Sequence, residues 1–328
     1  MLLEDKIYGR EDIQDSVLIE LINSKAVQRL KGISQRGYPE STEMGTDNPP
    51  YYTRYEHSVG CMLLLRKLGA GIDEQIAGLL HDLSHTAFSH VADWAIGDPQ
   101  KEDYQDSILG EYVTKSDAAA IITRYGHDLQ RICNMEIEGK FGLLERNAPD
   151  VCADRVDYAL RDSYNLQAGN VKKAFNGLVA RNGEIVFKSI DAARAFADCY
   201  VADIRESYAA PENLLRYHLL GSALKYAIDN KVISMGDLHK DEKTVMEKIN
   251  HSGNETAAQM LKASLGRLKF SVSNGRGVLL KYKLRYVDPK FIHGDRLERL
   301  SSADPEYSKI ISEEKERHAR GVYIEMIK

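Results

Sequence analysis

The chain has 328 residues, which is enough for one large domain or for a domain with a smaller appendage. Its hydrophobic fraction of 43% and charged fraction of 28% are ordinary for a globular protein, and a formal net charge of −5 gives no reason to expect nucleic acid or an anionic membrane as a partner. The N-terminus lacks a basic segment followed by an apolar stretch, and no run of about 18 apolar residues occurs. We therefore expect a cytoplasmic protein without a membrane span.

Helical patterns dominate the first two-thirds of the chain. Apolar residues recur with a helical period over residues 12–36, with a break near Ser24, and a polar loop rich in Gly and Pro follows at 37–53. Asp73 is the expected N-cap of a helix over 73–85. Further helices are expected at 55–69, 87–96, 102–113, 116–125, 149–163 and 191–230.

Strand signals are few until the last third of the chain. Asn182-Gly183 between two apolar triplets predicts a β-hairpin. After about residue 240, a charged helix at 242–266 leads into strand-like runs, with Asn274-Gly275 as a turn. These runs are 268–273, 277–287 and 321–327. The pattern predicts a mostly α fold, with a helical domain at 1–235 and a small α+β region at 236–328.

Four of the ten histidines, at positions 57, 81, 85 and 90, lie close together in the sequence and are accompanied by carboxylates. Imidazole and carboxylate are suitable ligands for Mg, Mn, Fe, Ni or Zn ions. The four cysteines (Cys61, Cys133, Cys152 and Cys199) are scattered without a CxxC pair, which predicts reduced thiols and excludes a zinc ribbon. A set of ligands without thiols argues against a purely structural zinc site.

Helical spacing places several of these polar groups on common faces. On a helix over 73–85, His81 and His85 share one face and Asp82 adjoins it. On a helix over 149–163, with Pro149 in its first turn, a stripe of one carboxylate, one aromatic ring and one further carboxylate forms a candidate pocket wall. The stripe consists of Asp154, Tyr158 and Asp162, and Arg155 and Arg161 flank it.

Each of these features has a structural alternative when it is taken alone. A single histidine such as His57 is more often a hydrogen-bonded structural residue, and a His-Asp pair often occurs by chance. The carboxylates of the 149–163 helix are equally consistent with a solvated face that carries salt bridges. Their joint order and spacing favour a metal site.

His57, then His81-Asp82, then Asp154 resembles the H…HD…D signature of HD-domain metal-dependent phosphohydrolases. The surrounding segments resemble the deoxynucleoside triphosphate triphosphohydrolase branch, which includes the SAM-and-HD-domain proteins. These segments are Gln28–Gln35, Arg54-Tyr-Glu-His57-Ser58, His81–His90, Asp154–Asp162 and, in the tail, Leu284–Pro289.

The resemblance implies a helical core that holds one divalent metal through His57, His81, Asp82 and Asp154. His90 matches the catalytic histidine of the family, and Asp93 matches the carboxylate that orients it. The residues that match phosphate-facing or sugar-facing positions are Arg54, His85, Gln35, Arg155, Tyr158 and Asp162. The resemblance further implies a nucleotide substrate and a homo-oligomer. The lack of a long apolar run and the acidic charge balance predict neither membrane nor nucleic acid as a partner.

Two positions depart from the pattern of the branch. Members that cleave at the α-phosphate often carry a further His-Glu pair after the HD motif, where this chain has Glu102-Asp103-Tyr104-Gln105-Asp106. Arg36 stands where vertebrate-type enzymes have an apolar residue. The expected reaction is hydrolysis of deoxynucleoside triphosphates to nucleoside and triphosphate. A nucleotide phosphatase or pyrophosphohydrolase that cleaves another bond, or a catalytically weak nucleotide-binding regulator, remains an alternative.

Overall fold

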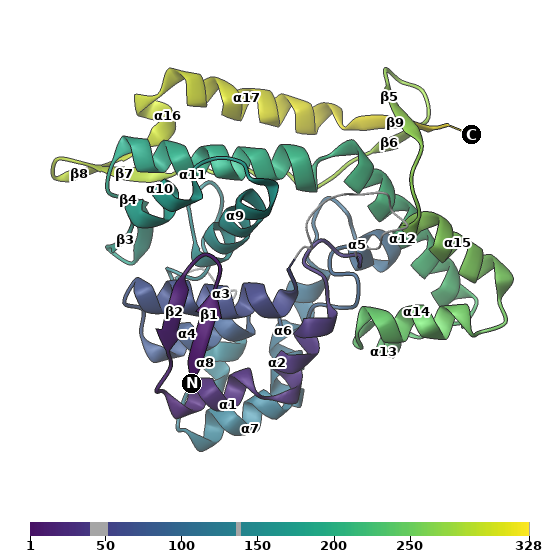
Figure 1. Cartoon of the computed structure of the whole chain (residues 1–328), viewed down its shortest axis with the longest axis horizontal. Coiled ribbons are helices and arrows are strands. Elements are labelled where there is room, and N and C mark those ends of the chain that lie inside the picture. The colour runs from purple at the N-terminus through teal and green to yellow at the C-terminus, as the bar shows by residue number, and fades with distance from the viewer. Residues whose placement is uncertain (40–51, 136–138, 328) are drawn as a thin grey trace.

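The computed structural model describes residues 1–39, 52–135 and 139–327, and it confirms a mostly helical fold with a small strand-containing C-terminal region (Figure 1). The expected polar loop at 37–53 therefore lies mostly outside the described residues. The four cysteines are unpaired, as expected. Among the described residues, no helix is both long and apolar enough to cross a membrane.

The N-terminal segment forms a hairpin and two short helices. Ser24 ends the first helical segment and caps the next, because its hydroxyl accepts a hydrogen bond from the backbone N–H of Val27 at 3.3 Å. The predicted break is thereby confirmed. The elements are β1 (Leu2–Asp5), β2 (Gly9–Asp12), α1 (Ser16–Ile22), α2 (Lys25–Arg29) and the 3₁₀ turn η1 (Leu30–Gly32).

Helix α3 (Arg54–Lys67) is the centre of the helical body and packs against α4 (Ile72–Leu80) and α9 (Ala153–Leu166). A capping box between Thr53 and Glu56 fixes its start. The expected N-cap at Asp73 was wrong, because Gly71 occupies that position. The other helices of this body are α5 (Val91–Ile96), α6 (Tyr104–Lys115), α7 (Asp117–Arg124) and α8 (Leu129–Cys133).

The two longest expected helices are each interrupted. The 191–230 segment divides into α11 (Ile190–Asp203), a π-helical turn η3 (Ile204–Tyr208) and α12 (Pro211–Asp229), because Pro211 lacks a backbone N–H and is accommodated only at a helix start. The 242–266 segment divides into α14 (Glu242–Asn250) and α15 (Glu255–Leu265), because Gly253 between them has a left-handed φ of +76°. The short helix α13 (Met235–Leu238) precedes them.

The tail contributes to two small sheets. Strands β5 (Phe270–Ser273), β9 (Val322–Met326) and β6 (Val278–Leu280) form one sheet in that order, so the last strand lies between the other two. The predicted hairpin at Asn182-Gly183 is confirmed as β3 (Leu178–Arg181) and β4 (Glu184–Phe187), which follow helix α10 (Val171–Gly177). Strands β7 (Lys290–His293) and β8 (Arg296–Arg299) extend this hairpin in the order β3-β4-β7-β8.

Helix α17 (Pro305–Arg320), which the sequence analysis missed, follows the short helix α16 (Leu300–Ala303) and lies along α11 (Figure 1). Arg194 of α11 pairs with Asp304, the N-cap of α17, at 2.7 Å, and Arg205 of η3 pairs with Glu314 of α17 at 2.6 Å. Buried residues of the tail and of the helical body form one apolar cluster, whereas α12, α14 and α15 pack around a second. The proposed division at residue 236 stays a prediction, although one sheet combines strands from both sides of it.

Gly60 allows the closest approach between α3 and α9. A Cβ atom at this position would lie 2.0 Å from Arg161 Nη2 and 2.1 Å from Asp157 Oδ1. Arg161 cannot move aside cheaply, because it donates to Asp157 at 2.8 Å and to Asp5 at 2.6 Å.

We therefore expect Gly60→Ala to lower the free energy of unfolding by about 1–3 kcal/mol, although alanine favours helices intrinsically. Urea denaturation followed by circular dichroism measures this change. Gly236→Ala in α13 is the matched control, because its Cβ would lie 3.7 Å from the nearest neighbour, Ser234 Oγ. Equal stability of the two variants would contradict the close contact.

Candidate metal centre

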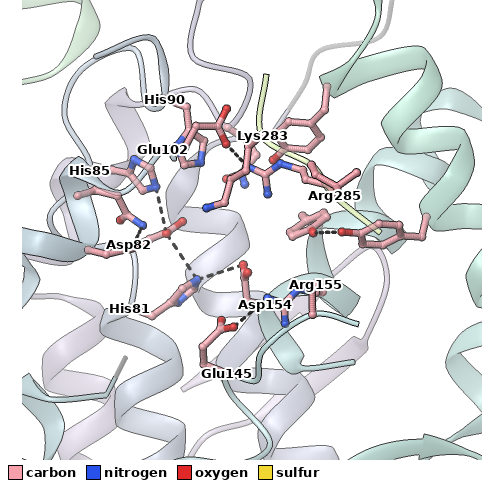
Figure 2. Close-up of a pocket in the computed structure, with 18 of the residues that line it drawn as sticks. His81, Asp82, His85, His90, Glu102, Glu145, Asp154, Arg155, Lys283 and Arg285 are labelled. Atoms are coloured by element: carbon pink, nitrogen blue, oxygen red, sulfur yellow. Dashed lines mark hydrogen bonds and ion pairs between the residues drawn. The ribbon is translucent and has the colours of Figure 1, made fainter. Parts of the chain in front are cut away.

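The four predicted ligands come from three segments. His81, Asp82 and Asp154 line a cavity of about 390 Å³ (Figure 2), whereas His57 is fully buried and is not among the described lining residues. His57 lies on α3, and Asp154 lies in the first turn of α9. His81 and Asp82 lie in the turn after α4, which ends at Leu80. The expectation that His81 and His85 share a helix face was therefore wrong, although both residues line the cavity.

The start of α9 also differs from the expectation. The peptide bond between Ala148 and Pro149 is cis. The helix begins at Ala153, so that Pro149 lies before its first turn. Asp154 is consequently in the first turn, where the backbone N–H groups favour a negative charge.

The candidate ligand atoms converge on one point. His57 Nε2 lies 3.0 Å from Asp154 Oδ1 and 3.1 Å from His81 Nε2. Asp82 oxygens lie 3.6 Å from each of these two imidazole nitrogens. Ligands that are each about 2.0–2.2 Å from a common metal ion are about 3.0–3.5 Å apart, so this spacing suits a single ion.

The hydrogen bonds of both imidazole rings leave their Nε2 atoms free to bind a cation. His81 Nδ1 donates to the carbonyl oxygen of Gly78 at 2.9 Å, and His57 Nδ1 donates to Asp157 at 2.7 Å. In the neutral rings, both Nε2 lone pairs therefore face the carboxylates of Asp82 and Asp154. Such a cluster of acceptors requires a positive charge at its centre.

The pKa of His81 indicates the same preference for a positive charge. Burial lowers it, but the charge of Asp82 and the hydrogen bond with Asp154 raise the pKa to about 10. The carboxylates of Asp82 and Asp154 thus favour a positive charge beside His81. The donor set, two imidazoles and two carboxylates, fits a divalent metal.

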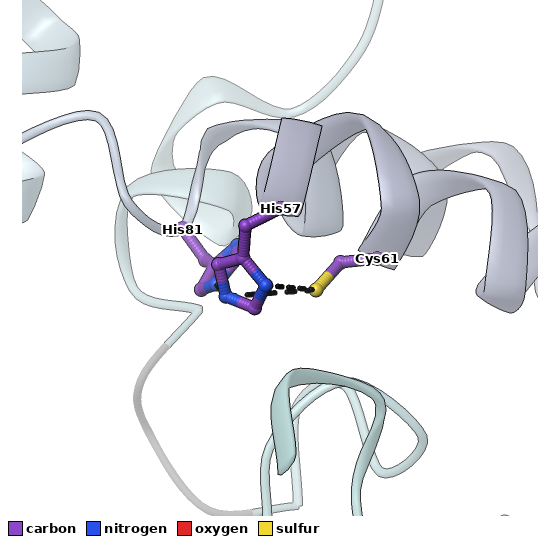
Figure 3. Close-up of side chains that lie close together, drawn as sticks. All are labelled: His57, Cys61 and His81. Carbon is purple, nitrogen blue, oxygen red and sulfur yellow. Dashed lines mark hydrogen bonds between the residues drawn. The ribbon is translucent and has the colours of Figure 1, made fainter. Parts of the chain in front are cut away.

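Cys61 lies one helical turn after His57, with its sulfur 3.8 Å from His57 Nδ1 (Figure 3). His57, Cys61 and His81 are close enough together to hold an ion. Burial and the nearby carboxylates, however, raise the pKa of Cys61 well above its usual range. The protonated thiol is a poor ligand, so the geometry favours Asp82 and Asp154 as the anionic partners.

The guanidinium group of Arg54 is occupied mainly by hydrogen bonds within the protein. It donates to Asp82 at 2.8 Å, to Ser89 Oγ at 3.0 Å and to the carbonyl oxygen of Gln35 at 3.3 Å. It lines the cavity, but its main contact holds the Asp82 carboxylate in place. Gln35 also lines the cavity, and its buried Oε1 has no hydrogen-bond partner among the described residues.

His85 and His90 face each other at the edge of the cavity, with ring centroids 4.9 Å apart. Burial lowers the pKa of each to about 3, so both rings are neutral. Phe88 and Ser89 have φ values of +68° and +48°, and this strained backbone directs His90 toward the cavity. Because Phe88 and Ser89 are not helical, α5 begins only after His90.

Asp93 lies near His90 but does not hold it by a hydrogen bond. The separation between His90 Nδ1 and Asp93 Oδ2 is 3.6 Å. Asp93 Oδ1 instead accepts a hydrogen bond from the backbone N–H of Tyr104 at 3.1 Å. The orienting role of Asp93 stays a prediction.

The substrate residues predicted on α9 divide into two groups. Arg155 and Tyr158 line the cavity, where Arg155 pairs with Glu145 at 3.1 Å and the Tyr158 hydroxyl lies 2.9 Å from that of Tyr200. Asp162 is buried beyond them beside Tyr52 and, within the described part of the chain, is not among the lining residues. The two ends of the stripe, Asp154 and Asp162, are about two helical turns apart, so the stripe extends past the cavity.

Sequence reasoning missed several side chains that line the cavity. The tail contributes Lys283 and Arg285, which lie opposite the metal ligands in Figure 2. The resemblance of the 284–289 segment to the family was the one available signal, but it gave no position in space. The other missed residues are Glu102, Gln105, Asp106, Glu145, Asn147, Tyr200, Tyr208 and Tyr286.

We expect Asp157→Asn to weaken metal binding about 10- to 100-fold, because it removes the carboxylate that orients His57 and makes its ring a stronger ligand. Equilibrium dialysis against Mn²⁺ with metal analysis measures the affinity. Asp191→Asn, an exposed carboxylate that pairs with Lys173, is the control. Unchanged affinity in Asp157→Asn would remove this residue from the metal centre.

Known proteins are similar to this chain in sequence and in fold. The HD domain family matches residues 54–158, which include all four candidate ligands. The uncharacterized protein YdhJ of Bacillus subtilis is 36% identical over 100% of both chains. A metal-dependent phosphohydrolase of Cordyceps militaris is 33% identical over 68% of this chain and 65% of its own.

A crystal structure of a phosphohydrolase from Bacteroides thetaiotaomicron has the same fold, with a TM-score of 0.68 over 93% of this chain and 94% of its own at 16% identity. HD domains bind a divalent metal, and this chain has a group of His57, Cys61 and His81, with acidic residues beside it, that could hold one. The chain therefore belongs to the HD-domain family of metal-dependent phosphohydrolases.

Proposed function

We propose that this protein hydrolyses a phosphate bond of a nucleotide at the metal centre formed by His57, His81, Asp82 and Asp154. The observation that carries the proposal is the convergence of polar atoms of these side chains, 3.0–3.6 Å apart, where three of them (His81, Asp82 and Asp154) line a cavity of about 390 Å³. Neutral histidines and a lysine complete the lining. A cation and an adjacent space for an anion are what phosphoryl transfer requires.

His57, His81, Asp82 and Asp154 would hold a divalent ion, which would supply Lewis-acid polarisation of the phosphoryl group and activation of water. The protein's own groups have the remaining tasks. Arg54 keeps Asp82 ionised and oriented through their 2.8 Å ion pair. His85, with its Nε2 3.3 Å from Asp82, adds a polar wall next to the substrate phosphate.

His90 is the proposed proton carrier. Its ring is neutral, it lines the cavity, and its buried Nδ1 has no hydrogen-bond partner among the described residues. Entry of an anionic phosphate raises the pKa of a nearby imidazole. His90 would then take a proton from the attacking water and deliver it to the leaving oxygen.

Three tyrosines support a nucleotide as the substrate. Tyr158, Tyr200 and Tyr208 line one side of the cavity and provide aromatic faces and hydroxyl groups for a sugar or a base. A small phosphate ester without such a group would leave this wall without a partner.

Two nucleotide classes have support. The motif resemblance favours deoxynucleoside triphosphates. The charges of the cavity favour a single phosphate group. Among the described residues that line it, five carry carboxyl groups (Asp82, Glu102, Asp106, Glu145 and Asp154) and four are cationic (Arg54, Arg155, Lys283 and Arg285). With a divalent ion the balance is slightly positive, which suits one phosphate of about −1.5 to −2 charge better than three.

Incubation of Mn²⁺-loaded protein with nucleoside mono-, di- and triphosphates, in ribose and deoxyribose forms, decides between these classes. Chromatography of the products identifies the bond: triphosphate release indicates the triphosphohydrolase reaction, and inorganic phosphate indicates a phosphatase. His81→Ala is the control for contaminating activity. No metal-dependent turnover of any nucleotide would contradict the proposal.

We expect His90→Ala to bind metal normally and to lower kcat about 10²- to 10⁴-fold, since it removes the proton carrier without touching the metal ligands. Steady-state kinetics and metal analysis of the same sample measure both properties. His127→Ala, at a surface pair with Asp73 away from the cavity, is the matched control. A normal rate in His90→Ala would exclude His90 from the reaction.

A further inference from the structure

The segment between β6 and β7, residues 281–289, crosses the cavity on the side opposite the metal ligands (Figure 2). We call this segment the strap. Lys283 and Arg285 alternate with Leu284 and Tyr286 along it, and all four residues line the cavity. The tail of the chain thus supplies one wall of the proposed active site.

Hydrogen bonds to backbone groups near both ends of the strap hold it in place. His318 donates from Nε2 to the carbonyl oxygen of Tyr282 at 2.8 Å, and the Tyr307 hydroxyl donates to that of Val287 at 2.7 Å. Both donors belong to α17. The backbone N–H of Asp288 donates to the carbonyl oxygen of Pro149 at 2.9 Å, which ties the strap to the loop before α9.

Arg285 is occupied by contacts within the protein. Its guanidinium pairs with the buried carboxylate of Glu102 and lies 4.3 Å from the centroid of the Tyr208 ring. Tyr208 is the last residue of the π-helical turn, a type of irregularity that is frequent at functional sites. Arg285 therefore fixes the position of the strap.

Lys283 differs from the other cations of the cavity. Arg54, Arg155 and Arg285 are paired with Asp82, Glu145 and Glu102 respectively. Within residues 1–39, 52–135 and 139–327, Lys283 makes neither a hydrogen bond nor an ion pair. Figure 2 shows its side chain extending from the strap into the space between His90 and Asp154.

We propose that Lys283 binds an anionic oxygen of the substrate phosphate from the side opposite the metal ion. This inference rests on the proposed function. The partly buried ammonium is held over the cavity by a fixed backbone, and it lacks a protein partner of its own. A lysine in this setting is a typical phosphate ligand, because its three donors adapt to a tetrahedral anion.

Lys283 is a substrate-binding residue and takes no part in holding the metal. Replacement of Lys283 is therefore expected to separate phosphate affinity from metal content. Loss of one charged hydrogen-bond donor to phosphate corresponds to about a 10- to 100-fold loss of affinity.

The test is isothermal titration calorimetry of Mn²⁺-loaded full-length protein with inorganic phosphate. We expect Lys283→Met to weaken phosphate binding about 10- to 100-fold, and Lys283→Arg to restore most of it. Lys281→Met, two residues earlier and outside the cavity lining, is the matched control and should bind phosphate normally. Metal analysis and circular dichroism should give the same manganese content and helical signal for all variants.

Three results would overturn the inference: normal phosphate binding by Lys283→Met, an equal loss in Lys281→Met, or no phosphate binding by the unaltered protein. Other results would show whether the proposed function, rather than the phosphate site, is wrong. If Lys283→Met weakens phosphate binding but no nucleotide is hydrolysed, the phosphate site stands without the nucleotide reaction. If nucleotides are hydrolysed with an unchanged KM in Lys283→Met, the reaction stands without this phosphate site.

Discussion

The geometry of the metal centre depends on one buried contact, the hydrogen bond of 2.7 Å between His57 and Asp157. Asp157 is fully buried, and its charge is balanced by Arg161, which in turn pairs with Asp5 of the N-terminal hairpin. A buried carboxylate without such partners would be strongly destabilising, so these groups are ordered together. Only a glycine at position 60 leaves room for this network between α3 and α9. The crossing of the two helices is thus set by polar contacts as well as by the apolar core.

This network orients His57, and similar contacts orient the other groups. Gly78 fixes the ring of His81, and Arg54 fixes the carboxylate of Asp82. These three candidate ligands are therefore oriented within the protein itself, which lowers the cost of ordering the site on metal binding. The same rigidity explains why the neighbouring turn tolerates left-handed backbone at Phe88 and Ser89, since the surrounding structure holds these residues in place.

The sequence predicted the local features well where one residue type determines the backbone. The break at Ser24, the hairpin at Asn182-Gly183 and the mostly helical fold are examples. Predictions from the sequence were wrong where contacts between residues far apart in the chain determine the structure. Periodicity continued through residues 81–85, but the chain leaves the helix at Leu80, so that the arrangement of His81, Asp82 and His85 could not be inferred from helical spacing. The helix α17 and the strap acquire their positions from α11 and the loop at Pro149, which no local pattern encodes.

An acidic protein can still bind an anion, because its charges are neutralised locally. Three of the four cations that line the cavity are each paired with a carboxylate, and these pairs contribute little net field. Burial raises the pKa of Asp106 to about 7, which removes part of its negative charge at neutral pH. What remains to attract a phosphate is the metal ion on one wall and the ammonium of Lys283 on the other. Two positive centres on opposite sides of one cavity select a compact anion by position, and the net charge of −5 on the whole chain then affects only its approach.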